Sequence, residues 1–327
     1  FSGAILGIGI LMGGAWAYEA LSFGGYWAWD PVENMSLVPW MVLLAGIHTH
    51  LVARATGHSI LSTYLFYIIS FLLVLYSTFL TRSGVLGETS VHAFTEMGLE
   101  WQLVGFIGFF LILGIGWLVY RASSIPAPSV EERLPSREFW MFIGSLVLVF
   151  GAVLITVSTS FPVYNKIRQY FDPAFEGFTV NDPVAHHNKF QLWVAVFIAL
   201  LASISQYLRY GAFGWKKYAR KFWTHLGAAS LLSLVLTWLT AQWIQINTWQ
   251  YGVLLLAGIF AIVHNLDYLA NFLRFNLKKG GAIIAHLGFG LMIVGILASG
   301  LNKRFYNNPY VNQDFIEGFT KDDQGKN

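Results

Sequence analysis

Long apolar segments separated by short polar links dominate the chain. A helix needs about 20 mostly apolar residues to cross a bilayer. Segments of about this length cover residues 2–20, 38–56, 60–81, 102–120, 139–161, 190–208, 224–244, 251–273 and 282–301. One soluble core could not bury so many apolar segments. The pattern therefore predicts an all-α, polytopic membrane protein with about nine transmembrane helices.

The composition supports this prediction and narrows the chemistry. Hydrophobic residues make up 56% of the 327 residues and charged residues 11%, with a mean hydropathy of +0.56. A soluble domain carries roughly 25% charged residues. The net charge of +3 is too small to indicate a nucleic-acid partner. The chain has no cysteine, which excludes disulfides, thiolate metal sites and a thiol nucleophile, so histidine is the main candidate metal ligand.

Lysine and arginine predict the orientation. They concentrate in the links 121–137, 207–223 and 274–280, and Arg54 lies in the short link after the second segment. Cytoplasmic loops carry an excess of these residues, so we expect all four links to lie inside. The loops 22–37 and 82–101, the stretch 162–189 and the tail from 302 then lie outside, although Lys303 and Arg304 oppose this placement of the tail.

The outer parts divide into two kinds. Stretch 162–189 is aromatic with mixed charges, which is typical of an amphipathic segment on the bilayer surface. Residues 1–301 then form one transmembrane domain, and 302–327 read as the truncated start of an external segment. Because the chain starts at Phe1 rather than Met, we expect it to be a piece of a longer protein.

The aromatic loop 22–37 is the most unusual part of the sequence. Asp30, Pro31 and Glu33 form a helix-start signature, with an N-cap, a proline at the first position and a capping-box glutamate. Asp30 is therefore either a structural cap or a site residue. Trp27 and Trp29 would face the same way in an extended loop and form one flat wall. The alternative is that they anchor the loop at the membrane interface.

Histidines inside apolar segments are costly and suggest function. His48 lies about ten residues from the outer end of its segment, and His286 lies about five residues from the inner end of the last one, which runs the opposite way. Both therefore fall in the inner half of the bilayer at similar levels, where two neutral imidazoles could clamp a b-type haem. His264 also lies in the inner half, so depth alone does not exclude it.

Other candidates lie in the outer loops. His92 in loop 82–101 is either a solvated histidine or an iron ligand, and His186 and His187 in stretch 162–189 are further possible ligands. Arg82 lies at the outer end of its segment. It could pair with a haem propionate or simply flank the interface.

Several ordered motifs resemble one known family. Residues 24–34 (Gly-Gly-Tyr-Trp-Ala-Trp-Asp-Pro-Val-Glu-Asn) look like the tryptophan-rich "WWD" signature of haem-handling proteins. Their continuation through residues 39–48, together with residues 79–85 and 90–94 (Ser-Val-His-Ala-Phe), is similar to the CcmF family, the cytochrome c haem lyases of the system I pathway. The resemblance covers most of residues 1–301 and is weak between about 121 and 280.

The resemblance implies an enzyme of the bacterial inner membrane whose active site faces the periplasm. It would join haem vinyl groups to the thiols of the Cys-x-x-Cys-His motif of an apocytochrome c. Haem b would be the substrate at the Trp loop and also a resident cofactor. The implied partners are the apocytochrome, a haem chaperone, thiol-presenting maturation subunits and an electron donor, of which quinol is the simplest.

The resemblance also implies residue roles. The implied catalytic residues are His92, Trp27, Trp29 and Asp30. The resident haem would be held by His48 and His286, within the sequence Ile-Ile-Ala-His-Leu-Gly. Tyr26 and Arg82 would complete the cofactor-binding residues.

One departure and three rival functions stay open. The family brings a second outer histidine upstream of the Trp loop, and no residue precedes Phe1 here. Either that residue lies in absent sequence, or His186 or His187 replaces it. The rivals are a haem transporter or delivery protein without ligase activity, a secondary transporter, and a structural subunit. A transporter would be expected to show inverted repeats, and the sequence shows no convincing repeat.

Overall fold

The structure is a computed structural model that describes residues 1–20, 26–90, 98–126, 128, 132–212 and 214–301. These residues form helices and no strand, which confirms the all-α prediction. The α-helices are α1 (Ser2–Ala20), α2 (Pro31–Thr56), α3 (Ile60–Arg82), α4 (Glu100–Arg121), α5 (Arg137–Thr159), α6 (Phe161–Phe171), α7 (Pro183–Ile204), α8 (Trp215–Ala241), α9 (Trp249–Asn271) and α10 (Gly281–Leu301). Within this described part, nine helices are long and apolar enough to cross a membrane, as predicted.

Short 3₁₀ helices connect some of these elements. They are η1 (Gly87–Thr89), η2 (Ala122–Ser124), η3 (Ser205–Tyr207), η4 (Tyr210–Ala212) and η5 (Leu277–Lys279). The η3 turn follows α7 directly and matters for the site described below.

Several helices extend beyond the apolar segments that predicted them. Helix α2 begins at Pro31 rather than residue 38, and α8 begins at Trp215 rather than residue 224. Hydrophobicity marks only the part of a helix that meets lipid or core, whereas caps and local propensity fix its ends. Stretch 162–189 was expected to be one surface segment. It is divided between α6, a connection and the first turns of α7, so His186 and His187 are helical residues.

The first helical bundle is built around α2, which packs against α3 and α5. Its buried core includes Val38, Leu80 and Ile155, each 0% exposed. A proline inside α2, Pro39, has no N–H to offer the Met35 carbonyl one turn earlier. The Ser77 hydroxyl of α3 donates to that carbonyl at 2.5 Å. The helix therefore continues through the proline, and α2 is tied to α3.

A second bundle is formed by α7, α8, α9 and α10. Its buried core includes Leu255, Ala261 and Ile293. Helix α7 is shared between the bundles, because Val194 belongs to the first core and Val196 to the second. The two bundles meet mainly where α5 packs against α7.

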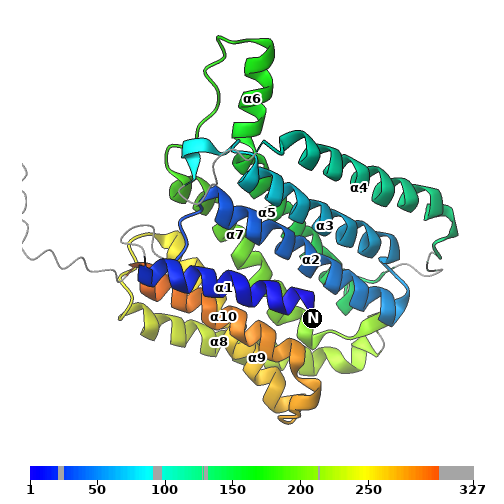
Figure 1. Cartoon of the computed structure of the whole chain (residues 1–327). Coiled ribbons are helices and arrows are strands. Elements are labelled where there is room, and N and C mark those ends of the chain that lie inside the picture. Colours follow the sequence, from blue (N-terminus) through cyan, green and yellow to red (C-terminus); the bar gives the residue numbers. More distant parts are fainter. Residues whose placement is uncertain (21–25, 91–97, 127, 129–131, 213, 302–327) are drawn as a thin grey trace, which may run out of the picture.

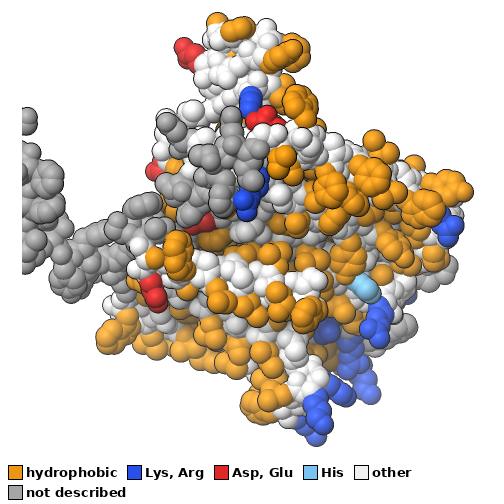
Figure 2. Space-filling model, in the orientation of Figure 1, with side chains coloured by type: hydrophobic (Ala, Val, Ile, Leu, Met, Phe, Trp, Pro, Cys, Tyr) orange, Lys and Arg blue, Asp and Glu red, His pale blue; other side chains and the backbone are white. Residues whose placement is uncertain are grey.

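The long helices run roughly side by side, and the four basic links lie at the same end of them (Figure 1). A broad apolar surface covers the helices, and Lys and Arg gather at the lower right of the molecule (Figure 2). Exposed basic residues at that end include Lys216, Lys217, Lys278 and Lys279. This arrangement agrees with a multi-pass membrane protein; which side faces the cytoplasm stays a prediction.

Helix α6 projects beyond the ends of the long helices (Figure 1). Asn165 holds the returning chain, since its amide nitrogen donates to the Phe178 carbonyl and its amide oxygen accepts from the Phe178 N–H, both at 2.8 Å. Tyr164 and Phe175 pack against Phe178. This segment is therefore a small folded unit at the end opposite the basic links.

Candidate functional site

The Trp loop ends in the capping box that the sequence predicts. The Asp30 carboxylate accepts from the Val32 N–H at 2.9 Å, and the Glu33 carboxylate accepts from the N–H groups of Asp30 (3.1 Å) and Ala28 (3.0 Å). These bonds satisfy N–H groups that no helical carbonyl can reach. Asp30 is thus a true N-cap, and its proposed catalytic role stays a prediction.

The two tryptophans do not form the single flat wall expected from their spacing. Their ring centroids are 5.9 Å apart and the planes are 89° to each other, an edge-to-face arrangement. The physical reason lies in the backbone, because Trp29 has a positive φ of 58° and the loop is not extended there. Trp27 and Trp29 therefore form two walls of a corner.

Trp29 is held from the side by the first turns of α7. Its ring stacks on the His187 imidazole, with centroids 5.0 Å apart and planes 23° from parallel. Its indole N–H donates to the Asn188 amide oxygen at 2.9 Å. The sequence analysis missed Asn188 as a site residue. In the sequence, Asn188 stands out only because it follows His186 and His187. Nothing in the sequence links it to residue 29.

The two outer histidines have different surroundings. His187 is 5% exposed and lies under Trp29, with the Asn34 amide 3.5 Å from its Nε2. His186 lies 2.8 Å from the Ser158 hydroxyl and lines a cavity of about 140 Å³ between α5 and α7. His187 lines the same cavity. The stacking on Trp29 makes His187 a support for that ring, whereas His186 contacts Ser158.

Trp27 carries an unsatisfied polar atom. Its indole N–H is buried and has no acceptor among the described residues. An unpaired buried donor costs about 1–3 kcal/mol. Tyr26 lies against α1 instead, where its hydroxyl donates to the Leu11 carbonyl at 2.9 Å and its ring packs on Gly14. The Trp27 N–H is thus a polar group of this loop that a ligand could satisfy.

The second outer loop approaches the first. The Ser90 hydroxyl donates to the Asp30 carboxylate at 2.8 Å. His92 itself lies outside the described residues, but Ser90 is two positions before it. Arg82 is the last residue of α3. The Ser90–Asp30 bond joins the chain leading to His92 to the cap of the Trp loop.

The inner histidines lie close together with nearly parallel ring planes. His48 of α2 and His286 of α10 have ring centroids 6.2 Å apart and planes 14° from parallel. An imidazole nitrogen binds a metal at about 2.0–2.1 Å, so two imidazoles on opposite sides of one ion have centres roughly 6 Å apart. The pair therefore has the separation that a shared ion would need.

The two helices carrying this pair pack mainly elsewhere. Helix α2 packs against α1, α3 and α5, while α10 packs against α9 and α7. The His48 Nδ1–H donates to the Leu44 carbonyl at 2.8 Å, which leaves its Nε2 as the nitrogen with a lone pair. On the other side, the Gln206 amide lies 2.7 Å from His286 Nδ1. Each ring is thus held through Nδ1.

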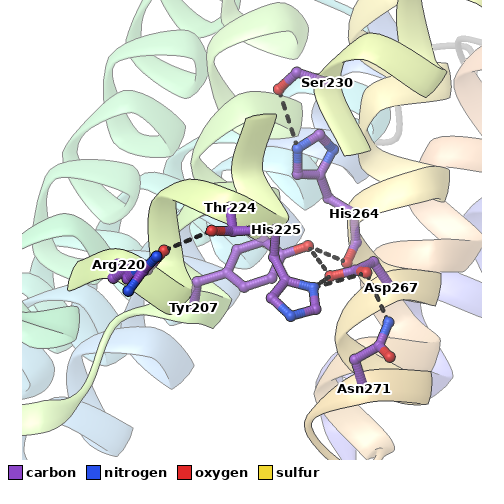
Figure 3. Close-up of polar contacts among 8 residues, drawn as sticks. All are labelled: Tyr207, Arg220, Thr224, His225, Ser230, His264, Asp267 and Asn271. Atoms are coloured by element: carbon purple, nitrogen blue, oxygen red, sulfur yellow. Dashed lines mark hydrogen bonds and ion pairs between the residues drawn. The ribbon is translucent and has the colours of Figure 1, made fainter. Parts of the chain in front are cut away.

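His264, the rival of this pair, is occupied elsewhere. It is 0% exposed, and its Nδ1–H donates to the Phe260 carbonyl at 2.9 Å. Its Nε2 lies 3.4 Å from the Ser230 hydroxyl (Figure 3). Both ring nitrogens therefore have protein partners, so the geometry favours His48 with His286.

The described residues contain no group of three or more His, Cys, Asp or Glu side chains arranged around one metal site. A metal held by protein alone is therefore not supported there. Two neighbouring imidazoles can bind an iron whose other four ligands belong to a macrocycle. The spacing of the inner pair is compatible with such a group.

Comparison with known proteins points to one class of protein. The model of the family "Cytochrome C assembly protein" matches residues 1–86. The fold and this match indicate a multi-pass helical membrane protein related to cytochrome c assembly proteins.

More specific relatives cover nearly the whole chain. The cytochrome c-type biogenesis protein CcmF of Escherichia coli is 30% identical over 90% of this chain and 44% of its own length. CcmF of Pseudomonas fluorescens is 33% identical over 92% of this chain and 45% of its own. A solved structure titled "Cytochrome c Heme Lyase CcmF" shares the fold, with a TM-score of 0.63 and 23% identity over 91% of this chain and 44% of that one. The chain is a CcmF-like protein, and it spans slightly less than half the length of these relatives.

Proposed function

We propose that this chain is the haem-handling part of a cytochrome c haem lyase. It would bind haem at the outer Trp loop, position it for thioether formation on an apocytochrome c, and hold a second haem b in the membrane. The observation that carries the proposal is the facing pair His48 and His286, 6.2 Å apart on two helices that pack mainly against other neighbours.

The inner residues fit a resident haem b. His48 and His286 would hold it, and Nδ1 of each ring already contacts a protein group, the Leu44 carbonyl or the Gln206 amide. When bound, this group would supply one-electron transfer. The chain's own residues would fix the two imidazoles, and α2 and α10 would exclude water from either side. Quinol is the proposed electron donor.

The outer residues suit a haem that comes and goes as substrate. Trp27 and Trp29 offer aromatic faces in a corner, and the buried Trp27 N–H has no acceptor among the described residues, so a haem propionate could accept from it. Arg82 could pair with a propionate. His92 would be an axial ligand, reached through the segment that Ser90 ties to Asp30. Tyr26 would hold the loop on α1.

The proposed chemistry needs positioning rather than a protein nucleophile. Each thiol S–H of the Cys-x-x-Cys-His motif adds across one haem vinyl group, and the thiol hydrogen ends on the neighbouring vinyl carbon. Correct orientation of two thiols and two vinyl groups lowers the barrier by up to several kcal/mol. This agrees with the absence of cysteine from the chain. A haem chaperone and thiol-presenting maturation subunits would deliver the two substrates.

Two measurements test the proposal. The first is the pyridine haemochrome content of the purified wild type and of His48→Ala, His286→Ala and His50→Ala. We expect haem b in the wild type and in His50→Ala, because His50 is exposed and its Nδ1 lies 3.0 Å from the Tyr67 hydroxyl rather than beside His286. Both other variants should lose it. Full haem content in His48→Ala and His286→Ala would remove the resident-haem proposal.

The second measurement is covalent cytochrome c production in cells whose only copy of the complete protein carries His92→Ala. We expect production to fall while the resident haem b stays. A haem transporter or delivery protein would instead be indicated if haem crossed or left the protein normally and another component made the thioether bonds.

A further inference from the structure

We propose that Gln206 is a positioning residue that orients the His286 imidazole and selects which of its nitrogens faces His48. This inference rests on the proposed resident haem and deepens it. The amide lies 2.7 Å from His286 Nδ1 and comes from η3, a different element from α10. Gln206 is 7% exposed, so water does not compete freely for the imidazole.

The argument begins with the tautomers of a neutral imidazole. One ring nitrogen carries hydrogen and the other carries the lone pair that binds a metal. For His48 the choice is fixed, because the Leu44 carbonyl can only accept and therefore holds the hydrogen on Nδ1. An amide can either donate through Nε2 or accept through Oε1, and a half-turn about its last bond exchanges them. In the structure the Gln206 amide nitrogen faces His286 Nδ1, which leaves the ring hydrogen on Nε2. A half-turn of the amide brings Oε1 to Nδ1, moves the hydrogen to Nδ1 and leaves the Nε2 lone pair to bind a metal.

Gln206 can play this part because its backbone is fixed from α5. The Arg137 guanidinium donates to the Ser205 carbonyl at 3.2 Å and also to the Gln206 carbonyl. A further contact attaches the residues just after η3 to α5, as the Arg137 N–H donates to the Arg209 carbonyl at 3.1 Å. The backbone on both sides of the Gln206 side chain is therefore attached to the start of α5.

The following residue fixes η3 to α9. Tyr207 is 0% exposed, and its hydroxyl lies 3.0 Å from the His264 carbonyl and 2.9 Å from the Asp267 carboxylate. The same carboxylate contacts His225 at 3.1 Å and accepts from the Asn271 amide at 2.8 Å (Figure 3). The backbone around Gln206 is thus held by α5 on one side and by α9 on the other. The terminal amide of its side chain can still rotate about its last bond.

Two consequences follow for a haem between His48 and His286. An acceptor on Nδ1–H makes an imidazole a stronger donor to iron and fixes its plane. A stronger donor favours the ferric state over the ferrous state, so the acceptor lowers the midpoint potential. Gln206 would therefore tune both the retention of the haem and its potential, without contacting it.

The experiment compares purified wild-type protein with Gln206→Leu, Gln206→Glu and the control Gln191→Leu. Gln191 is a second buried glutamine and lies in α7. Its amide donates to the Gly151 carbonyl of α5 at 3.0 Å. The readouts are haem dissociation rate, redox midpoint potential and the electron paramagnetic resonance signal of the ferric haem. None of these is an activity of the protein.

We expect Gln206→Leu to lose haem about 10- to 100-fold more readily and to raise the midpoint potential. Gln206→Glu keeps an acceptor, so it should retain haem and lower the potential. Gln191→Leu should match the wild type in all three readouts. If Gln206→Leu does not fold, the potential of Gln206→Glu decides the question.

The inference is overturned if Gln206→Glu has the wild-type potential and resonance signal, or if Gln206→Leu retains haem as the wild type does. Failure of the underlying proposal has a different signature. In that case the wild type itself contains no haem b, or keeps it when His48 or His286 is replaced.

Discussion

The inner histidine pair and the outer Trp loop are held in different ways. At the inner pair, each imidazole projects from a long helix, and its Nδ1 contacts one group, Leu44 or Gln206. At the outer loop, Trp29 is positioned by several contacts from separate segments: the cap at Asp30, the α7 residues His187 and Asn188, and an edge from Trp27.

The difference suggests how one chain can treat two haems differently. Rigid helices with a ligand on each side suit a cofactor that stays. A corner of rings at the end of the bundle, assembled from loop and helix start, suits a planar ligand that must enter and leave. The two regions should therefore respond separately to substitution.

The largest expected effect separates the two sites. Trp29→Ala removes an aromatic face and the contacts that orient the loop, and misplacement of a reactant by about 1 Å can cost on the order of 100-fold in rate. We expect covalent cytochrome c production to fall by about that factor, with resident haem b per protein unchanged. Loss of resident haem in Trp29→Ala would show that the two regions are not independent.

A smaller effect tests whether His187 packs under Trp29 or binds iron. Loss of a ring–ring contact is worth about 0.5–1.5 kcal/mol, so His187→Ala should lower cytochrome c production about 2- to 10-fold. His187→Phe restores a ring under Trp29 and should recover most of it. If His187→Phe is as inactive as His187→Ala, the imidazole acts as an iron ligand. His186→Ala, measured in the same assay, tests the neighbouring histidine.

The next effect concerns the cap that joins the two outer loops. Asp30→Ala should lower the free energy of unfolding by about 0.5–2 kcal/mol through the lost N-cap, measured by denaturant unfolding in detergent. Asp182→Ala removes a comparable cap, which accepts from the Ala185 N–H at 2.9 Å at the start of α7. Only Asp30→Ala should also reduce cytochrome c production, because only Asp30 binds Ser90. If Asp30→Ala and Asp182→Ala reduce cytochrome c production equally, the role of Asp30 is purely structural.

The smallest effect concerns the frame of the inner site. Tyr207→Phe removes two hydroxyl contacts and should cost about 0.5–1.5 kcal/mol of stability. Tyr76→Phe is the control, since its hydroxyl donates to the Ser160 hydroxyl at 2.7 Å, between α3 and the end of α5 that leads into α6. Tyr207→Phe should also shift the haem midpoint potential slightly, whereas Tyr76→Phe should not. An unchanged potential in both would limit the role of Tyr207 to folding.

The sequence predicts those features that depend on local or periodic patterns. Nine membrane-length helices, the capping box at Asp30 and the closeness of His48 to His286 all follow from hydropathy, helix-start residues and depth along a helix. Each needs only helix geometry and the alternation of direction between successive spans. The ligand roles of these residues stay predictions.

Other features depend on contacts that the sequence does not encode locally. The perpendicular rings of Trp27 and Trp29 follow from a positive φ that a bulky residue rarely adopts. Asn188 and Gln206 contact residues that are far away in the sequence, Trp29 and His286 respectively. Their roles can therefore be inferred only from the folded structure. A single amide in a polar or apolar run has no pattern of its own, so tertiary packing alone identifies it.

The inner histidines belong to different bundles, His48 to the one around α2 and His286 to the one around α9. Any group that bridges them would also join the two bundles, beside the contact between the start of α5 and η3. Ligand binding to the native state alone stabilises that state by mass action. If the proposed haem is that group, its supply would set how stable the folded protein is in the membrane.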